Sequence, residues 1–578
     1  MENPPMKSVP KKDDSPKVGM SREEVLRSEI DQVAPETKVR SDRQKLAEPV
    51  GRIEFDKYMT QIVQFINDYF DESHKQSVIP EADASTARLK TPIPDKSDSC
   101  LSIIEDLKKA VVPNMCHTQH PRYHAKFSGR CLADTLATTL SAALGCDSNC
   151  SPMVDVIERV LCNWMSQAMQ LPKMKRCITD EKAEKEPIGT VLYTPTDVYL
   201  CLILNWKARN ENYQESTSDL KRHYYDYVVY CSDDAHYPLE EACVLGKVKL
   251  RKVITAKEDC HGMTGSRLEK QIIKDLERQM TPLLIVSTFG SANLGANDNL
   301  KEIVKIAEKF NIPVHCDASY AGFEWIEPTK RSDVHKYLSN VQSVHVNFNT
   351  LLPYSGNLSI LWSAEKFVLE HGRINRNGGD TLKLWILIRL YGMKALREAV
   401  RRKVNLGNIL SDRLTHQSEF AVLHPNEHGI VLFQYYNTSI KGRTTDANTL
   451  TSMFYSYMVE SAQMKCGFVK FNDKIMLRAC INYEKSNASI MEESVSTLLN
   501  IVDEFEEKMK TKNNLLKMAL KSEFVEQIGG SPNQSTEGTP PTSQIETTTN
   551  NNIVNRKETN KNISNLKKTP SKNNIQNK

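Results

Sequence analysis

The chain has 578 residues, of which 39% are hydrophobic and 26% charged, and its net charge is +4. This length accommodates a large globular core with extensions, while a charge so near zero does not predict a nucleic-acid partner. No apolar run is long enough to span a membrane, and the 14 cysteines show neither CxxC nor metal-ligand spacing, so we expect a reduced, cytoplasmic protein.

The two ends of the chain differ in composition from its middle. Residues 1–50 are rich in Lys, Asp, Glu, Ser and Pro and lack an apolar face, so we expect them to be disordered. Residues 511–578 are predicted to form a helical extension and then a disordered tail, in which Asn, Thr, Ser and Pro predominate. The ordered part of the chain is therefore expected between these two ends.

Two amphipathic helices are predicted in the first part of this middle region. One starts at Arg52, where apolar residues recur every three or four positions, and the other starts at Pro152. The apolar stripe of the first helix is Phe55, Met59, Ile62, Val63, Ile66, Tyr69 and Phe70. The core side of the second helix is predicted to be Val156, Ile157, Val160, Leu161 and Trp164.

A strand–helix–strand unit is predicted further along the chain. Residues 283–291 and 312–319 have the pattern of buried strands, and residues 299–310 between them have that of a helix. Such a crossover is right-handed and joins parallel strands, whose carboxyl ends bind ligands. Ser291 and Asp317 fall at these ends. Asp317 could serve a cationic ligand, bind a metal or cap a helix, and the absence of a ligand-spaced cluster argues against the metal.

Two further candidates lie at other strand ends. His236 stands in a polar turn between a β-branched run and a predicted helix, where a lone histidine is more often structural than catalytic. The segment 189–197 ends at a helix start, where Thr194, Thr196 and Asp197 could cap the helix or hold an anion. Pro195 removes one backbone donor from that turn, which weakens the anion interpretation.

Residues 342–362 predict two apolar strands joined by a turn with the sequence Asn-Phe-Asn. With eight other segments in matching order, this stretch resembles the group II pyridoxal-phosphate-dependent amino-acid decarboxylases. The aromatic-L-amino-acid decarboxylases are the most similar, and the tyrosine and histidine decarboxylases follow. The other segments are LKTPIP (89–94), HTQHPRYHAKF (117–127), the helix at 151–170, SDDAHYPLEEA (232–242), STFGSANLGANDNL (287–300), HCDASYAGFEWIEP (315–328), TLKLWILIRLYGMKALREAV (381–400) and DKIMLRACI (473–481).

The resemblance covers about residues 52–505 and implies an α/β fold. This is the fold-type I transferase fold of pyridoxal-phosphate enzymes, with a mainly parallel sheet flanked by helices and a small C-terminal α+β domain. The implied parts are an N-terminal dimerisation segment (51–126), a large domain (127–395) and a small domain (396–510). The resemblance also implies a homodimer, with an active paralogue as a second conceivable partner.

The resemblance further implies a site for pyridoxal 5′-phosphate. Asp317 matches the aspartate that pairs with the pyridine nitrogen and keeps it protonated, and His236 matches the histidine that stacks on the ring. The other implied site residues are Thr196 in the phosphate loop, Ser291 as a pocket hydroxyl, Ser319 beside the aspartate, and Asn349 before the family's Pro-His-Lys.

The chain departs from the family in the catalytic equipment. Leu352 stands where the family has the lysine that holds the cofactor as a Schiff base, and Leu351 replaces the preceding histidine. The stretch from Trp362 to Thr381 is too short for the family's mobile loop, whose acid is worth roughly 10²–10⁴-fold in rate. No catalytic residue is therefore retained, His236 is vestigial, and the cofactor is expected to bind noncovalently and weakly at best.

Three functions remain open at this stage. The leading hypothesis is an aromatic-L-amino-acid-decarboxylase-like protein without decarboxylase chemistry, which acts through binding and dimerisation. The alternative is an active decarboxylase that converts an aromatic amino acid or histidine to its amine and CO2. This alternative requires the gene model to be misassembled around residues 350–380. An unrelated ligand-binding module, its pocket refilled by Leu351 and Leu352, is the third.

Overall fold

The computed structural model describes residues 50–80, 97–127, 129–146, 151–172, 189–215, 226–331, 333–363, 378–423, 427–436 and 446–510. The chain forms two compact units, residues 1–70 with 90–107 and residues 71–89 with 108–578. The disorder expected at both ends and the helical extension after 510 lie outside the described residues, apart from Val50. Among the described residues, no helix combines the length and the apolar character needed to cross a membrane.

The first unit contains helix α3 (Cys100–Asp106) and most of helix α2 (Arg52–Glu72). The predicted start of α2 at Arg52 is confirmed, but none of its residues is fully buried. Phe55 and Val63 of the predicted stripe are exposed, and the other stripe residues are half-buried. Ser99 caps α3 by accepting a hydrogen bond from the Ser102 backbone N–H at 3.2 Å.

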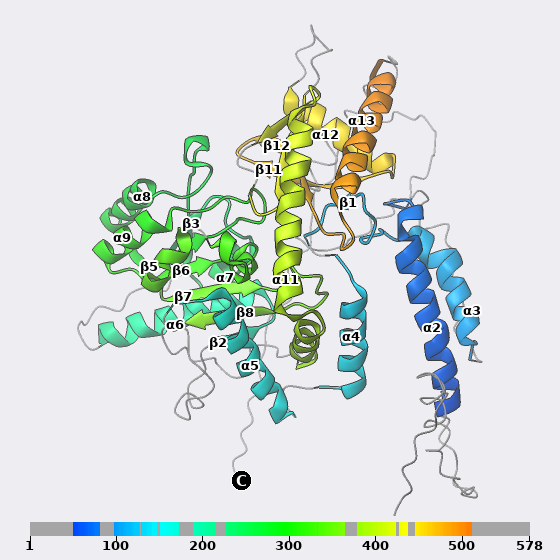
Figure 1. Cartoon of the computed structure of the whole chain (residues 1–578). Coiled ribbons are helices and arrows are strands. Elements are labelled where there is room, and N and C mark those ends of the chain that lie inside the picture. Colours follow the sequence, from blue (N-terminus) through cyan, green and yellow to red (C-terminus); the bar gives the residue numbers. More distant parts are fainter. Residues whose placement is uncertain are drawn as a thin grey trace, which may run out of the picture. The chain divides into compact units, whose positions relative to one another are not determined.

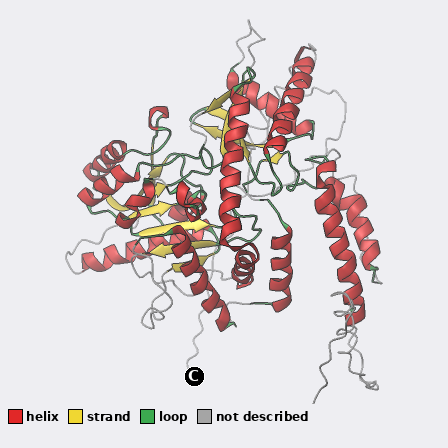
Figure 2. Cartoon of the chain, viewed as in Figure 1, coloured by secondary structure: helices red, strands yellow, loops and turns green. Residues whose placement is uncertain are grey.

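The second unit contains a seven-stranded sheet in the order β2-β8-β7-β6-β5-β3-β4, drawn as yellow arrows in Figure 2. Strand β8 runs antiparallel to both neighbours, and the other pairs are parallel, so the predicted mainly parallel α/β fold is confirmed. The strands are β2 (Gly189–Leu192), β3 (Tyr227–Ser232), β4 (Lys249–Val253), β5 (Thr281–Thr288), β6 (Val314–Asp317), β7 (Ser343–Asn347) and β8 (Ser359–Ser363).

The predicted strand–helix–strand unit is present as β5, α9 (Leu300–Phe310) and β6. The two strands are parallel and pair Thr288 with Asp317 at their carboxyl ends. Asn299 caps α9 through its side chain. Helices α6 (Pro195–Glu215) and α7 (Pro238–Leu245) share one apolar cluster with the sheet, while α5 (Pro152–Met169), α8 (Gly265–Glu277) and α9 share another (Figure 1).

The core face of α5 agrees with the prediction in part, because Leu161 is buried and Ile157 and Trp164 pack against the main core. The helix starts at Pro152 as expected, but Val156 is 39% exposed, and the buried apolar residues are Val154, Leu161, Cys162, Met165 and Met169. Apolar residues surround much of this helix, so the sequence pattern fits more than one stripe. Packing against β2, α11 (Gly378–Thr415) and residues 322–326 selects the one that is buried.

A second, five-stranded sheet has the order β1-β11-β12-β10-β9. Its strands are β1 (Tyr123–His124), β9 (Phe420–Leu423), β10 (Ile430–Tyr435), β11 (Lys465–Phe471) and β12 (Lys474–Cys480). Helices α12 (Ala447–Glu460) and α13 (Ala488–Lys510) share its apolar core. The long helix α11 bends at Gly392, whose φ of 69° is non-helical, and contacts α4 (Leu132–Leu144), α5 and both β9 and β10.

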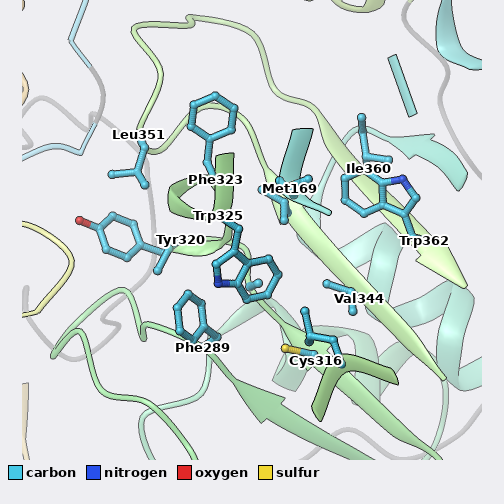
Figure 3. Close-up of a cluster of buried hydrophobic side chains, with 14 of the residues drawn as sticks. Met169, Phe289, Cys316, Tyr320, Phe323, Trp325, Val344, Leu351, Ile360 and Trp362 are labelled. Carbon is cyan, nitrogen blue, oxygen red and sulfur yellow. The ribbon is translucent and has the colours of Figure 1, made fainter. Parts of the chain in front are cut away.

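The main apolar core lies beneath the turn between β7 and β8. Figure 3 shows Leu351 of that turn beside Phe323, with Trp325, Phe289 and Tyr320 in the same cluster. This core fixes the turn that carries positions 351 and 352, so the candidate site is built on packed elements rather than on a free loop.

Candidate cofactor site

Asp317 ends strand β6 and is the centre of the candidate site. Its carboxylate is buried, with a relative exposure of 1% for the residue. Oδ1 accepts the backbone N–H of Ser319 at 2.9 Å, and Oδ2 accepts the hydroxyl of Tyr199 at 2.6 Å. Tyr199 comes from the second turn of α6 and has no exposed surface. Each carboxylate oxygen therefore has a donor from the protein itself.

Two buried histidines continue this arrangement across the sheet. His345 Nε2 lies 3.4 Å from Asp317 Oδ1, and His345 Nδ1 lies 2.8 Å from His315 Nε2. His315 Nδ1 in turn lies 2.8 Å from Ser343 Oγ. The register explains the proximity, because β6 and β7 pair His315 with Ser343 and Asp317 with His345. Alternate residues of a strand share a face, so all four side chains point to the same side.

The electrostatics of this group favour neutral imidazoles beside an ionised carboxylate. Burial lowers the pKa of His345 to about 4 and that of His315 well below its usual value. Burial alone would raise the pKa of Asp317, but the neighbouring histidines and the hydrogen bonds from Tyr199 and Ser319 lower it to about 2. Because the imidazoles are neutral at pH 7, we assign the main stabilisation of the carboxylate there to the two hydrogen bonds.

Each neutral imidazole carries one N–H, so the direction of these hydrogen bonds depends on the tautomers. With the His345 proton on Nε2, which lies 3.4 Å from Asp317 Oδ1, His315 Nε2–H donates to His345 Nδ1 and the Ser343 hydroxyl donates to His315 Nδ1. The contact of His345 with the carboxylate is electrostatic, since Nε2 has no hydrogen-bond partner among the described residues.

His236 lies near Asp317, as the resemblance implied. It follows β3, and burial lowers its pKa while the charge of Asp317 opposes this shift. Its Nδ1 is buried and has no hydrogen-bond partner among the described residues. Ser291 has a structural environment instead, because its Oγ accepts the backbone N–H groups of Leu294 at 3.4 Å and Ala296 at 3.0 Å.

Asn349 and Ser319 are held by the turn after β7. The backbone N–H of Asn349 donates to Asn347 Oδ1 at 2.9 Å, and its side-chain amide donates to Asn357 Oδ1 at 3.3 Å. The backbone N–H of Asn347 donates to the carbonyl of Ser319 at 3.2 Å. These bonds fasten the turn to the end of β6.

At the start of α6, Thr194 and Asp197 form a helix cap. The Thr194 hydroxyl donates to Asp197 Oδ2 at 2.7 Å, and the Asp197 backbone N–H donates to Thr194 Oγ1 at 3.1 Å. The Thr196 hydroxyl donates to Glu241 Oε2 at 2.8 Å. Of the two interpretations left open by the sequence, the structure favours the cap over the anion site, because a carboxylate already faces Thr196.

Leu351 and Leu352 are both buried, with Leu352 only 2% exposed in the main core. Lys403 from α11 donates to the carbonyl of Leu351 at 2.6 Å, and burial lowers the pKa of this amine to about 8. Sequence reasoning missed Lys403, Tyr199 and His345. The alternation His-x-Asp on β6 and Ser-x-His on β7 is the one sequence signal that could have indicated the histidine pair.

A family model described as "Pyridoxal-dependent decarboxylase conserved domain" matches residues 83–375 and 359–436. The chain belongs to this family, as the sequence analysis predicted. It is similar to the aromatic-L-amino-acid decarboxylase of Drosophila melanogaster, with 27% identity over 417 residues, which cover 66% of this chain and 79% of the relative. It is also 27% identical to tyrosine decarboxylase 2 of Arabidopsis thaliana over 412 residues, 64% of this chain and 73% of the relative.

Solved structures show the same fold. The structure titled Oryza sativa TDC with PLP has a TM-score of 0.70 at 21% identity and covers 80% of this chain and 99% of its own. Catharanthus roseus tryptophan decarboxylase has a TM-score of 0.69 at 21% identity, with 79% and 100% coverage. These similarities place the fold among the pyridoxal-phosphate decarboxylases.

Three features of the described side chains do not fit pyridoxal phosphate, the cofactor to which the description of this family refers. Position 352 offers no amine for an imine, and Oδ2 of Asp317 is already bonded to Tyr199. The Thr196 hydroxyl is bonded to a carboxylate, which would repel a phosphate group.

Proposed function

We propose that this protein is an aromatic-L-amino-acid-decarboxylase-like protein that has lost decarboxylase chemistry and acts through binding and dimerisation in the cytoplasm. The observation that carries the proposal is Leu352, which is buried in the main core at the position of the family's lysine. A hydrocarbon side chain forms no imine, so the covalent route to cofactor capture and product release is closed.

The remaining site residues are proposed to be remnants of a cofactor site. Ser319 contacts Asp317 at the end of β6, and His236, which follows β3, interacts electrostatically with Asp317, which supports a shared origin. Ser291 and Asn349 are engaged in local hydrogen bonds, and Thr196 in one to Glu241 of α7. Pyridoxal 5′-phosphate would therefore bind noncovalently and weakly at best, and His236 would have no reaction to serve.

Dimerisation is supported by an apolar face on α4 that the described residues of the second unit leave exposed. Its four leucines recur every fourth residue and are 44–67% exposed, so they form one stripe along the helix (Leu132, Leu136, Leu140 and Leu144). Soluble monomers rarely expose so many aligned leucines. We propose a second copy of this chain as the occupant, with an interface above roughly 2,000 Å². An active paralogue in place of that copy is the other outcome to test for.

The proposed loss of activity is tested with the purified full-length protein, pyridoxal 5′-phosphate and aromatic amino acids or histidine. We expect no CO2 release above a blank, and no cofactor on the peptide with Leu352 after borohydride reduction. Leu352→Lys alone should not restore turnover, because the family's mobile loop is missing. An aromatic-L-amino-acid decarboxylase is the positive control, and robust CO2 release by the wild type would establish the alternative, an active decarboxylase.

A further inference from the structure

The pair formed by Tyr199 and Asp317 is a fully buried polar contact of the candidate site. The phenol hydroxyl and the carboxylate Oδ2 are 2.6 Å apart, and the two residues are 0% and 1% exposed. A bond this short to an ionised acceptor is of the strong, charge-assisted type. The residues are separated by 118 positions in the chain, so the bond joins α6 to the end of β6.

The tyrosine ring has no freedom to leave this position. It stands edge-on to His345 at a centroid distance of 5.3 Å and to His315 at 6.2 Å. Its other neighbours belong to the apolar cluster between α6, α7 and the sheet, which includes Leu202 and Val286. Packing of this kind fixes a rotamer, and it makes removal of the hydroxyl from the carboxylate costly, because the phenol would be left buried and unpaired.

The other side of the carboxylate is equally engaged. Oδ1 accepts the Ser319 backbone N–H at 2.9 Å and faces His345 Nε2 at 3.4 Å. His345 is itself held by His315, and His315 by Ser343. A buried carboxylate needs such donors to remain ionised without a cationic partner.

We propose that Tyr199 is an internal ligand of Asp317, which occupies Oδ2 of the carboxylate with a donor of the protein itself and thereby weakens the binding of pyridoxal 5′-phosphate there. The inference rests on the proposed function, since it assumes that Asp317 is the remnant of the cofactor's partner. A pyridinium N–H that approached Oδ2 would have to share this oxygen with the phenol O–H. The phenol is covalently part of the fold and pays no association entropy, so it prevails at ordinary cofactor concentrations.

The test measures cofactor binding rather than turnover. Full-length wild type, Tyr199→Ala, Tyr199→Phe and the control Tyr435→Phe are titrated with pyridoxal 5′-phosphate, followed by its absorbance and by the midpoint of thermal unfolding. Tyr435 is a matched control, because it is also buried and donates to a carboxylate, that of Glu506 at 3.0 Å, but in the second sheet.

We expect weak cofactor binding by the wild type and the control, measured at high cofactor concentration, and about tenfold tighter binding by Tyr199→Ala, which frees both the acceptor and the space. Tyr199→Phe keeps the packing and frees only the acceptor, so it should gain less, about threefold. If folded Tyr199→Phe binds no better than the wild type, the inference is overturned, and this holds even if Tyr199→Ala does not fold.

Two further results separate this inference from the proposed function. Wild-type protein that binds the cofactor tightly without releasing CO2 would overturn the role of Tyr199 and leave the loss of activity intact. Wild-type protein that releases CO2 from an aromatic amino acid would overturn the proposed function itself.

Discussion

The end of strand β6 and the exposed face of α4 have opposite character. At β6, a carboxylate, a phenol, two imidazoles and a hydroxyl are buried, and each contacts the next. On α4, four leucines are aligned and face outward. The polar groups are enclosed by the fold, and the apolar groups are left uncovered by it.

This contrast indicates which region is stable within the fold and which region needs a partner. Buried polar groups are usually paired, and the Asp317 carboxylate has its donors Tyr199 and Ser319 within the fold without a ligand. An exposed leucine stripe instead marks a surface that commonly contacts a partner. We therefore expect the end of β6 to be stable without the cofactor, and the α4 face to depend on association.

Removal of the Asp317 carboxylate should have the largest effect. Asp317→Leu would leave the Tyr199 hydroxyl and the Ser319 N–H buried without an acceptor, and we expect a loss of about 3–5 kcal/mol in the free energy of unfolding. Asp317→Asn keeps one acceptor and should lose about half as much. Urea unfolding followed by circular dichroism measures both. Equal stabilities of Asp317→Leu and wild type would mean that this group does not hold β6 and β7 together.

Charges on the α4 face should weaken association by about 100-fold, or roughly 2.7 kcal/mol. Leu136→Asp combined with Leu140→Asp would place two carboxylates in the proposed interface, where desolvation opposes them. Light scattering over a dilution series measures the change from dimer to monomer.

The matched control for the α4 variant lies on α7. Val244 and Leu245 are 73% and 57% exposed, so their replacement by Asp adds the same charge to another apolar surface of the second unit. The control should remain a dimer. A wild-type monomer at all concentrations would remove the dimer from the proposal, and equal weakening by both variants would point to a nonspecific effect of charge.

The sequence predicted the elements of the sheet well, because the buried strands and the Pro and Asn helix starts are local signals. Pro152, Pro238 and Asn299 each precede or begin the expected helix. The proximity of Asp317 and His236 could be predicted, because both were expected at the carboxyl ends of parallel strands. The exposed α4 stripe was not predicted, although its spacing of four residues is visible in the sequence.

Tyr199 could not have been found in this way. It stands within the apolar run YLCLIL, where an aromatic residue is expected to be part of the core. Its partner is 118 residues further along, and only the packing of α6 against the sheet directs the hydroxyl to Asp317. The buried stripe of α5 is likewise decided by tertiary packing, in that case against β2, α11 and residues 322–326.

Loss of the Tyr199 hydroxyl should have an intermediate effect that depends on pH. Tyr199→Phe removes one hydrogen bond to an ionised group, so we expect a loss of about 1.5–3 kcal/mol at pH 7. The pKa of Asp317 is lowered to about 2 in the folded protein, from a usual value of 3.8, so its contribution is present above pH 4 and is lost as the pH falls towards 2.

The difference between wild type and Tyr199→Phe should therefore be largest at neutral pH and should shrink below about pH 4. His236 and His345 also face Asp317, and the pKa of His345 is lowered to about 4, but both histidines are present in both proteins and cancel in the difference. Urea unfolding at a series of pH values measures it. A difference that does not vary with pH would show that the hydroxyl serves packing rather than the carboxylate.

The smallest effect is expected at the start of α6. Thr196→Val removes the hydrogen bond to Glu241, a residue in an exposed position, and such a bond contributes about 0.5–1 kcal/mol or less. If Thr196 held a phosphate group, the same change would also weaken binding of pyridoxal 5′-phosphate, and Glu241→Gln would strengthen it by removing a repelling charge. We expect neither change in cofactor titrations. Thr194 and Asp197 keep the helix capped in both variants, and Tyr199 still donates to the Asp317 carboxylate at the other end of the site. Tighter binding by Glu241→Gln would show that a phosphate group still reaches the turn at Thr196. The former site would then be able to bind the cofactor at this turn although Tyr199 occupies Asp317.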